Sequence, residues 1–483
     1  MTTDDRPRPE PRRRAPADRR PRPHLGVVAP LVVVVVAALA VLLTFPADAP
    51  HDTSGTATPG GTSVDSSSFV CPDLAAPSGT SVEDRVGLVA SVPGEKLGSG
   101  GTLRSGPVDS SRPRDLSVER GRQVVVPDEG GAAVQATGDL AAGVFGSRVD
   151  VRRDRSTGVA GCVAPRSQWW FTGAGAGLDH ASTLVLANVD PGPAVVDLRV
   201  LGPDGQVETV ATKGIPVPPH SVKTVELDSI APQTDDLALG VHATRGRVAA
   251  SVEDAFAAKP DDRPGREWLA GTELPSRSLR LAGLPVTASR RTLLVANPGD
   301  SEAVVSVRVA GTSGSFAPTG LDEISVDPGA VASVDVADVL PAKEAVGLRL
   351  RSTVPVVAAV RSSAGGDHAY ATVAPVVRGA AVAPLVAGQK ATVQLTAGAG
   401  KAAHVTVTAY ADDGRSVDST DLEVAPTATT AWSPGKGSGY VVVVPHSGTV
   451  DGAVTYTGDG LAATPLVSLP LRVLRPVVRP ATR

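Results

Sequence analysis

The sequence predicts an all-β protein made of tandem immunoglobulin-like β-sandwich modules that follow one N-terminal transmembrane helix. Three observations support this fold class. Apolar and polar residues alternate over short segments, turn-forming Gly and Pro separate these segments, and the segments recur with a regular period. The chain has 483 residues, with 51 Gly, 42 Pro and only 3% aromatic residues. A β-propeller that packs the same strands as paired blades is the alternative arrangement.

The N-terminal part predicts the topology of the chain. Residues 1–24 are rich in Arg and Pro, and we expect a disordered cytoplasmic tail. Residues 25–45 contain no charged side chain, and as a helix they would be about 30 Å long, which matches a bilayer core. Arginines on the N-terminal side predict that the rest of the chain is extracellular. We therefore expect a single-pass anchor at the cell membrane.

A cleavable signal peptide is the competing interpretation of this segment. Residues 47–49 read Ala-Asp-Ala and resemble a cleavage site. The apolar run is longer than the usual core of a signal peptide, and Pro50 would directly follow the cut. These two features favour the uncleaved anchor.

Beyond the anchor, residues 46–68 are rich in Ser, Thr, Gly and Pro and predict a flexible linker. The chain has only two cysteines, Cys71 and Cys162, and both follow the linker. Cysteines in an oxidising compartment usually pair. Neither belongs to a Cys-x-x-Cys motif or lies near a histidine, so we expect a structural disulfide between them.

The remainder of the chain repeats itself. Thr183–Asn188 matches Thr292–Asn297, and Ala194–Val200 matches Ala303–Val309 in the same register, 109 residues later. Weaker copies on either side predict four modules, of which the first is degenerate. The predicted modules are residues 69–165, 166–257, 258–364 and 365–483. We expect them to project from the membrane as a rod.

Each central module has a recognisable order of motifs. Aromatic residues come first, as in Trp169-Trp170-Phe171 and at Trp268. A leucine-rich strand ending in Asn follows, as in Asn297-Pro298-Gly299, and Pro355-Val356-Val357 closes the third module. In this order the chain resembles an uncharacterised family of membrane-anchored secreted proteins from high-GC Gram-positive bacteria.

That resemblance spans residues 70–475, although the fourth module lacks the Asn-Pro pair. It implies an envelope protein of unknown function, often encoded near a large membrane glycosyltransferase. The family supplies no catalytic residues that could be transferred to this sequence.

The sequence contains few candidates for chemistry. No His-x-x-x-His, His-Glu-x-x-His, Gly-x-Ser-x-Gly or phosphate-binding loop motif occurs, so we expect no metal and no cofactor. The aspartates around Gly414 are those expected of a tight turn. Asp367-His368 is the pair from which an unrecognised hydrolase site would be assembled. The net charge of −4 argues against a nucleic-acid partner.

Trp169, Trp170 and Trp268 have two interpretations. Exposed, they would stack on sugar rings; buried, they would fill the cores of the modules. The leading hypothesis is a non-enzymatic envelope protein that presents its β-repeats to an envelope protein, such as a glycosyltransferase, or to cell-wall polysaccharide. A carbohydrate-binding array and an envelope hydrolase are the alternatives.

Overall fold

The computed structural model describes residues 61–473, except residues 73, 75–78, 111, 127–130, 153–155, 260–261, 273 and 459. The predicted tail, the transmembrane helix and residues 46–60 of the linker lie outside the described residues. Among the residues described, no helix has the length and hydrophobicity needed to cross a membrane. The chain divides at Gly60–Gly61, and the unit Gly61–Arg483 is compact.

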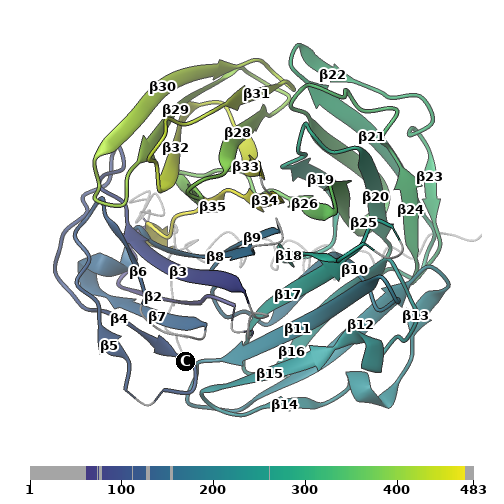
Figure 1. Ribbon diagram of the computed structural model, residues 1–483, viewed down its shortest axis with the longest axis horizontal. Coiled ribbons are helices and arrows are strands. Elements are labelled where there is room, and N and C mark those ends of the chain that lie inside the picture. Colours follow the sequence, from purple (N-terminus) through teal and green to yellow (C-terminus); the bar gives the residue numbers. More distant parts are fainter. Residues whose placement is uncertain are drawn as a thin grey trace, which may run out of the picture. The chain divides into compact units, whose positions relative to one another are not determined.

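The prediction of an all-β protein is confirmed. The described residues form β-strands, with only three short 3-10 helices, η1 (Gly138–Ala141), η2 (Val210–Thr212) and η3 (Leu227–Ser229). The strands belong to open antiparallel sheets that face one another in pairs, so each pair makes a two-sheet module (Figure 1).

The first two modules each contain two sheets, in which the strands have the following spatial order. The first module has β2 (Ser66–Val70), β7 (Ala132–Thr137), β4 (Leu103–Pro107) and β5 (Arg114–Asp115) facing β6 (Gln123–Val125), β3 (Thr80–Leu88), β8 (Val144–Arg152) and β9 (Thr157–Gly161). The second has β10 (Gln168–Ala174), β16 (Leu237–Arg245), β12 (Ala194–Gly202), β13 (Gly205–Val207) and β14 (Ile215–Val217) facing β15 (Ser221–Glu226), β11 (His180–Asn188), β17 (Ala249–Phe256) and β18 (Gly265–Leu269).

The last two modules follow the same plan. The third has β19 (Ser276–Ala282), β25 (Gly347–Ala364), β21 (Ala303–Gly311), β22 (Gly314–Phe316) and β23 (Ile324–Val326) facing β24 (Val331–Asp335), β20 (Arg290–Ala296), β25 again and β26 (Asp367–Val373). The fourth has β35 (Val467–Ser468), β27 (Ala381–Pro384), β32 (Tyr440–Ser447), β29 (Ala403–Tyr410) and β30 (Ser416–Val424) facing β31 (Thr429–Trp432), β28 (Lys390–Ala397), β33 (Val450–Thr457) and β34 (Leu461–Pro465).

The alternation in the sequence accounts for these sheets. In β21, Val305, Val307 and Val309 are buried between the two sheets, whereas Ser306 and Arg308 face outward. This is the period of two that a half-buried strand requires. The matched segments of the repeat also form matched strands, with β11 and β12 corresponding to β20 and β21.

The sheets divide the chain later than residue 257, the predicted end of the second module. The strand β18 pairs with β17 of the second module, with Phe256 opposite Gly265. Trp268 therefore closes the second module and does not open the third.

The four largest apolar cores each lie mainly between the two sheets of one module, and two of them extend into a neighbouring module, at Tyr370 and at Val159. Smaller apolar clusters lie between modules. This unequal packing is that of paired sheets in sandwiches and differs from a propeller with equivalent blades, and no sheet of the described residues closes into a barrel.

The expectation of a rod is wrong for the unit Gly61–Arg483. Its modules surround a common axis, and the fourth contacts the first (Figure 1). There β1 (Thr62–Ser63) pairs with β36 (Arg472–Val473), and the Tyr440 hydroxyl donates a hydrogen bond to the carbonyl of Gly121. The ring forms because modules carry apolar residues on the outer faces of their sheets, such as Phe145 and Val442, which a linear row would leave exposed at its ends.

Candidate functional site

The strands β9, β18, β26 and β34, one from each module, meet at the axis of the ring (Figure 1). The strands β9, β18 and β34 are each the last strand of their sheets, so one edge of each has no neighbour in that sheet, whereas β26 pairs with both β25 and β19. An unpaired backbone N–H is costly when it is buried. Side chains at the axis supply the missing acceptors.

Glu267 of β18 is one of these side chains. Its Oε1 accepts hydrogen bonds from the backbone N–H of Val159, at 3.0 Å, and of Trp268, at 2.8 Å. Its Oε2 accepts one from the N–H of Ala463 on β34, at 3.2 Å. The carboxyl therefore links three modules. Burial raises the pKa of Glu267 well above its ordinary value.

Asp367 of β26 does the same on the other side of the axis. Its Oδ2 accepts from the N–H of Leu461, at 2.7 Å, and of Thr157, at 3.3 Å, while its Oδ1 accepts from the Ser156 hydroxyl at 3.0 Å. Burial raises the pKa of this carboxyl. Asp367 is thus fully engaged in joining the third module to the first and the fourth.

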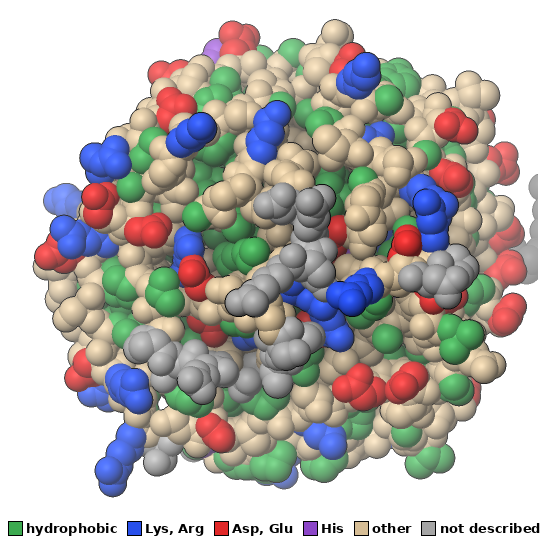
Figure 2. Space-filling view, viewed as in Figure 1, with side chains coloured by type: hydrophobic (Ala, Val, Ile, Leu, Met, Phe, Trp, Pro, Cys, Tyr) green, Lys and Arg blue, Asp and Glu red, His purple; other side chains and the backbone are tan. Residues whose placement is uncertain are grey.

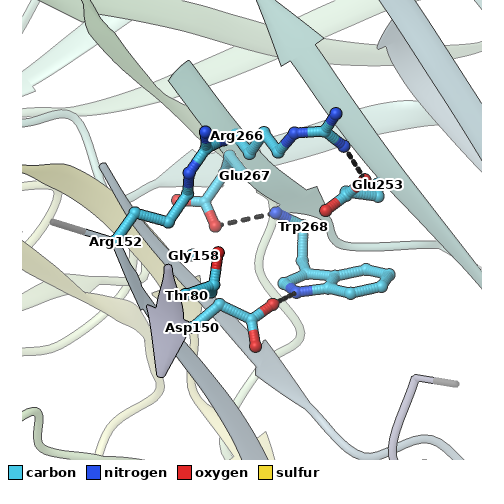
Figure 3. A pocket seen from close by; sticks show the side chains of 8 residues that line it. All are labelled: Thr80, Asp150, Arg152, Gly158, Glu253, Arg266, Glu267 and Trp268. Carbon is cyan, nitrogen blue, oxygen red and sulfur yellow. Dashed lines mark hydrogen bonds and ion pairs between the residues drawn. The ribbon is translucent and has the colours of Figure 1, made fainter. Parts of the chain in front are cut away.

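A small cavity beside Glu267 contains further carboxylates (Figure 3). Asp150 accepts a hydrogen bond from the Trp268 indole N–H at 2.7 Å, and Glu253 pairs with Arg266. Burial raises the pKa of both carboxyls. The cavity measures about 10 Å³, which is about the space that one water molecule needs. A sugar or peptide substrate does not fit there.

A second buried cluster surrounds Asp254, between the second and third modules. His180 donates to its Oδ1 from Nε2 at 3.0 Å, and the Tyr370 hydroxyl donates to its Oδ2 at 2.7 Å. The Nε2 atom of His368 lies 3.2 Å from Oδ2, and Ser182 also donates to this carboxylate. Asp254 and His368 are 0% exposed. The cluster therefore has no access to a substrate in this conformation.

The ring contains a much larger cavity, which we call the axial cavity. It measures about 670 Å³, within the range of about 300–1,000 Å³ typical of small-molecule sites. All four modules contribute to its wall. The lining comes mainly from β2, the end of β9, β10, β17, β18, β27 and the segment from β34 to β35, together with residues 162–164, 166, 270–272, 274, 373 and 375.

Trp169 and Trp268 both line the axial cavity, but each is only 3% exposed. The Trp169 indole N–H donates to the carbonyl of Val248 at 3.0 Å, and its ring stacks on Phe171. The Trp268 indole N–H bonds to Asp150. Both rings are therefore parts of the cavity wall.

Trp170 lies elsewhere. It is half-buried and packs with Leu201, Ala238 and Leu294, where the second module meets the third. A Cβ atom on Gly240 would come within 2.9 Å of the Trp170 ring, so glycine at 240 leaves room for this side chain. The structure therefore separates Trp170 from the other two tryptophans.

The remaining sequence candidates have structural positions. Cys71 and Cys162 form the predicted disulfide. His220 is an exposed turn residue with φ of 49°, at the position that Gly329 occupies, with φ of 73°, in the third module. Gly414, with φ of 87°, confirms the tight turn beside Asp413. Among the described residues no group of His, Cys, Asp or Glu side chains is arranged to hold a metal ion.

Glu267 and Asp254 were missed by sequence reasoning, although a signal was present. Asp254 lies two residues after Val252, and Glu267 two residues before Leu269, which are core residues. In a strand these positions share one face. A carboxylate in register with core residues indicates a buried polar contact.

The face of the molecule shown in Figure 2 carries acidic and basic side chains interspersed over its surface. No field of a single sign dominates this face. It therefore offers no broad electrostatic surface of the kind that binds nucleic acid.

The comparisons with known proteins give one family. Residues 114–435, more than half of the chain, match the family of unknown function DUF5719. The chain belongs to this family. The matched DUF5719 region covers the second and third modules completely, and with them Glu267, Asp254 and both tryptophans of the axial cavity.

No curated protein matches this DUF5719 chain. Among solved structures, an α-L-rhamnosidase from Streptomyces avermitilis, complexed with L-rhamnose, aligns at 10% sequence identity with a TM-score of 0.13. The alignment covers 81% of this chain but 55% of the enzyme. This likeness is too weak to support any statement about fold or activity.

Proposed function

We propose that this protein is a non-enzymatic binding protein of the cell envelope. A single helix at residues 25–45 anchors it, and its four β-modules are presented outside the membrane. The modules share the two-sheet architecture of immunoglobulin domains but have their own strand order, in which β10-β16-β12 faces β15-β11-β17-β18. The axial cavity is the binding site.

The observation that carries this proposal is the contrast between the axial cavity and the buried titratable groups. The axial cavity has the size of a ligand site and receives residues from all four modules. The acidic and histidine side chains of the interior are bonded to backbone or to one another, around spaces too small for a substrate. The architecture supports binding better than catalysis.

The partner that we propose is an envelope component, either a protein such as a membrane glycosyltransferase or a cell-wall polysaccharide. A photo-crosslinking amino acid at Ser251, a half-buried residue of the cavity wall, tests this in intact cells. We expect a discrete crosslinked product that disappears when Ala160, also in the wall, is replaced in the Ala160→Trp variant.

The matched control carries the same crosslinker at Leu178, which is 96% exposed and outside the cavity lining. The same products from both positions, or none from Ser251, would contradict the proposal. Ala160→Trp must retain the thermal unfolding midpoint of the parent chain for its result to count.

A carbohydrate-binding function is the second candidate, because Trp169 and Trp268 both line the axial cavity. Titration of the purified chain with fragments of the cell-wall polysaccharide tests it directly. Saturable binding that Ala160→Trp abolishes would favour this candidate over a protein partner.

The hydrolase alternative has less support. Asp367 and His368 are 4% and 0% exposed and make contacts within the interior. General acid–base catalysis requires a group within hydrogen-bond reach of a bound substrate. Neither residue lines the axial cavity.

A further inference from the structure

We propose that the axial cavity binds a single-chain amphiphile, with the apolar chain inside the cavity and an anionic head group at Arg166. This inference rests on the proposed function in that the axial cavity is the binding site, and it assigns the inside of that cavity to a small amphiphilic envelope molecule in place of a protein or a polysaccharide. Three observations support it. They are the chemistry of the lining residues, the exposure of apolar side chains at the rim, and the position of the one charged side chain among the described lining residues.

Two apolar side chains at the cavity are strongly exposed. Leu274 is 60% exposed and Val467 is 42% exposed, and both line the axial cavity. They belong to different parts of the ring, Leu274 to the connection between the second and third modules and Val467 to the fourth. Covering such residues with an apolar chain is favourable, at roughly 25 cal/mol per Å² of buried area.

The polar groups of the wall suit a hydrocarbon better than a sugar. Among the described residues that line the axial cavity, none has a carboxylate, an imidazole or a carboxamide. The polar side chains there are hydroxyls, such as Ser251 and Thr272, and the guanidinium of Arg166. Sugar hydroxyls buried against such a wall would lose hydrogen bonds to water and find only a few side-chain hydroxyls to replace them.

The tryptophans of the wall do not change this assignment. Stacking on a sugar requires an open ring face. Trp169 and Trp268 are almost completely buried, and their indole N–H groups are already bonded within the protein. They therefore contribute apolar wall area.

Arg166 defines the anionic end of the ligand. It is the only charged side chain among the described lining residues, it is exposed, and its guanidinium lies 5.2 Å from the centre of the Trp169 ring. A guanidinium has five N–H donors in a planar fork, which suits the oxygens of a carboxylate, sulfonate or phosphate. Charge complementarity therefore places the head group at this side of the cavity.

The test uses the purified unit of residues 61–483, which contains the cores of all four modules. Two fluorescent probes are titrated, the anionic 1-anilinonaphthalene-8-sulfonate and the uncharged N-phenyl-1-naphthylamine. Both should bind saturably at one site, and a long-chain fatty acid should displace both. Native oligosaccharide from the cell wall should displace neither.

Variants locate the site. Leu274→Glu and Val467→Glu should each weaken both probes about tenfold, because a charge replaces apolar surface at the rim. Arg166→Gln should weaken only the anionic probe, by about fivefold. The matched control Leu178→Glu changes a still more exposed leucine outside the cavity and should leave both affinities unchanged.

Each alternative outcome overturns the inference. Equal effects of Leu178→Glu and Leu274→Glu would place the probes elsewhere, and displacement by oligosaccharide would identify a glycan site. Absence of probe binding, together with a Ser251 crosslink in cells, would reject the amphiphile while keeping the proposed function. Absence of both would reject the two proposals together.

Discussion

Two buried aspartates show how neighbouring side chains determine whether the pKa of a buried carboxyl is raised or lowered. Burial alone would raise the pKa of Asp254, but His180 and then His368 lower it below the ordinary range. Burial also raises the pKa of Asp451, and there the nearby Arg349 and Arg280 only partly offset it, leaving a value of about 6. The two groups therefore make opposite contributions to stability as the pH changes.

The first prediction concerns Asp254. Replacement by Asn removes the negative charge and one of the two acceptor oxygens that His180, Ser182 and Tyr370 share, and should lower the free energy of unfolding by about 3 kcal/mol. Because the pKa of Asp254 is lower in the folded state than in the unfolded state, its contribution to the free energy of unfolding is complete above about pH 4. This contribution is lost as the pH falls further. Urea unfolding of the 61–483 unit at several pH values measures both effects.

Asp235→Asn is the matched control for Asp254, because Asp235 is 3.7 Å from the other ring nitrogen of His180 but is largely exposed. We expect a change within about 0.5 kcal/mol. An equal loss in both variants would show that the histidine, and not the buried carboxylate, dominates the cluster.

The second prediction concerns Asp451, whose pKa is raised from 3.8 to about 6. The folded state then binds a proton more tightly than the unfolded state, so stability is lost as the pH rises from about 4 to 6. Asp451→Asn should remove this loss, and the difference in unfolding free energy should shift in favour of the variant by about 3 kcal/mol over that interval. Asp204→Asn, in an exposed turn, should show no such shift.

At the level of elements, two asparagines fix the same turn in successive modules. At the end of β11, the Asn188 side chain donates to the carbonyl of Val217 at 3.0 Å and accepts from the N–H of Asp190 at 3.0 Å. After β20, Asn297 donates to the carbonyl of Val326 at 3.0 Å and accepts from Gly299 at 2.9 Å.

Neither asparagine has a positive φ, so a left-handed backbone is not the reason for Asn at these positions. Both side chains are 0% exposed, and they tie the strand end to the strand three segments later. A buried carboxamide with this set of partners is difficult to replace.

The third prediction follows from this equivalence. Asn188→Ala and Asn297→Ala should each lower the free energy of unfolding by about 2 kcal/mol, because buried carbonyls lose their donor. Asp300→Ala, an exposed neighbour of the second turn, should have little effect. Thermal or urea unfolding measures this, and a loss in only one module would contradict the structural equivalence of the repeats.

At the level of the whole unit, ring closure couples the modules. The disulfide between Cys71 and Cys162 lies in the first module, and the first module contacts both the second and the fourth. The cysteines are 91 residues apart. In the chain-entropy account, a loop of this size contributes about 4–5 kcal/mol to stability.

The fourth prediction is that the 61–483 unit unfolds in a single thermal transition, and that reduction lowers the midpoint of the entire transition. Differential scanning calorimetry with and without dithiothreitol measures this. The Cys71→Ala, Cys162→Ala double variant should resemble the reduced protein and not respond to the reductant. A separate early transition for the first module alone would show that the ring does not couple the modules.

Local patterns in the chain are sufficient for the strands, the repeats and the pairing of the cysteines. The alternation Val305, Val307, Val309 states which face of β21 is buried, because side chains of a strand point alternately to its two faces. The match between Thr183–Asn188 and Thr292–Asn297 predicts that two modules contain equivalent strands, which are β11 and β20. The strands and the repeats depend on residues that are close together in the sequence, so the sequence alone is sufficient to predict them.

The ring, the axial cavity and the burial of the tryptophans come from packing between distant segments. Glu267 bonds to Ala463, 196 residues later, and Trp268 to Asp150, 118 residues earlier. A tryptophan at the start or end of a strand looks the same in sequence whether it faces solvent or a neighbouring module. For Trp268, only the closure of the modules around one axis places Asp150 of the first module beside the indole N–H, because burial depends on which surfaces meet in space.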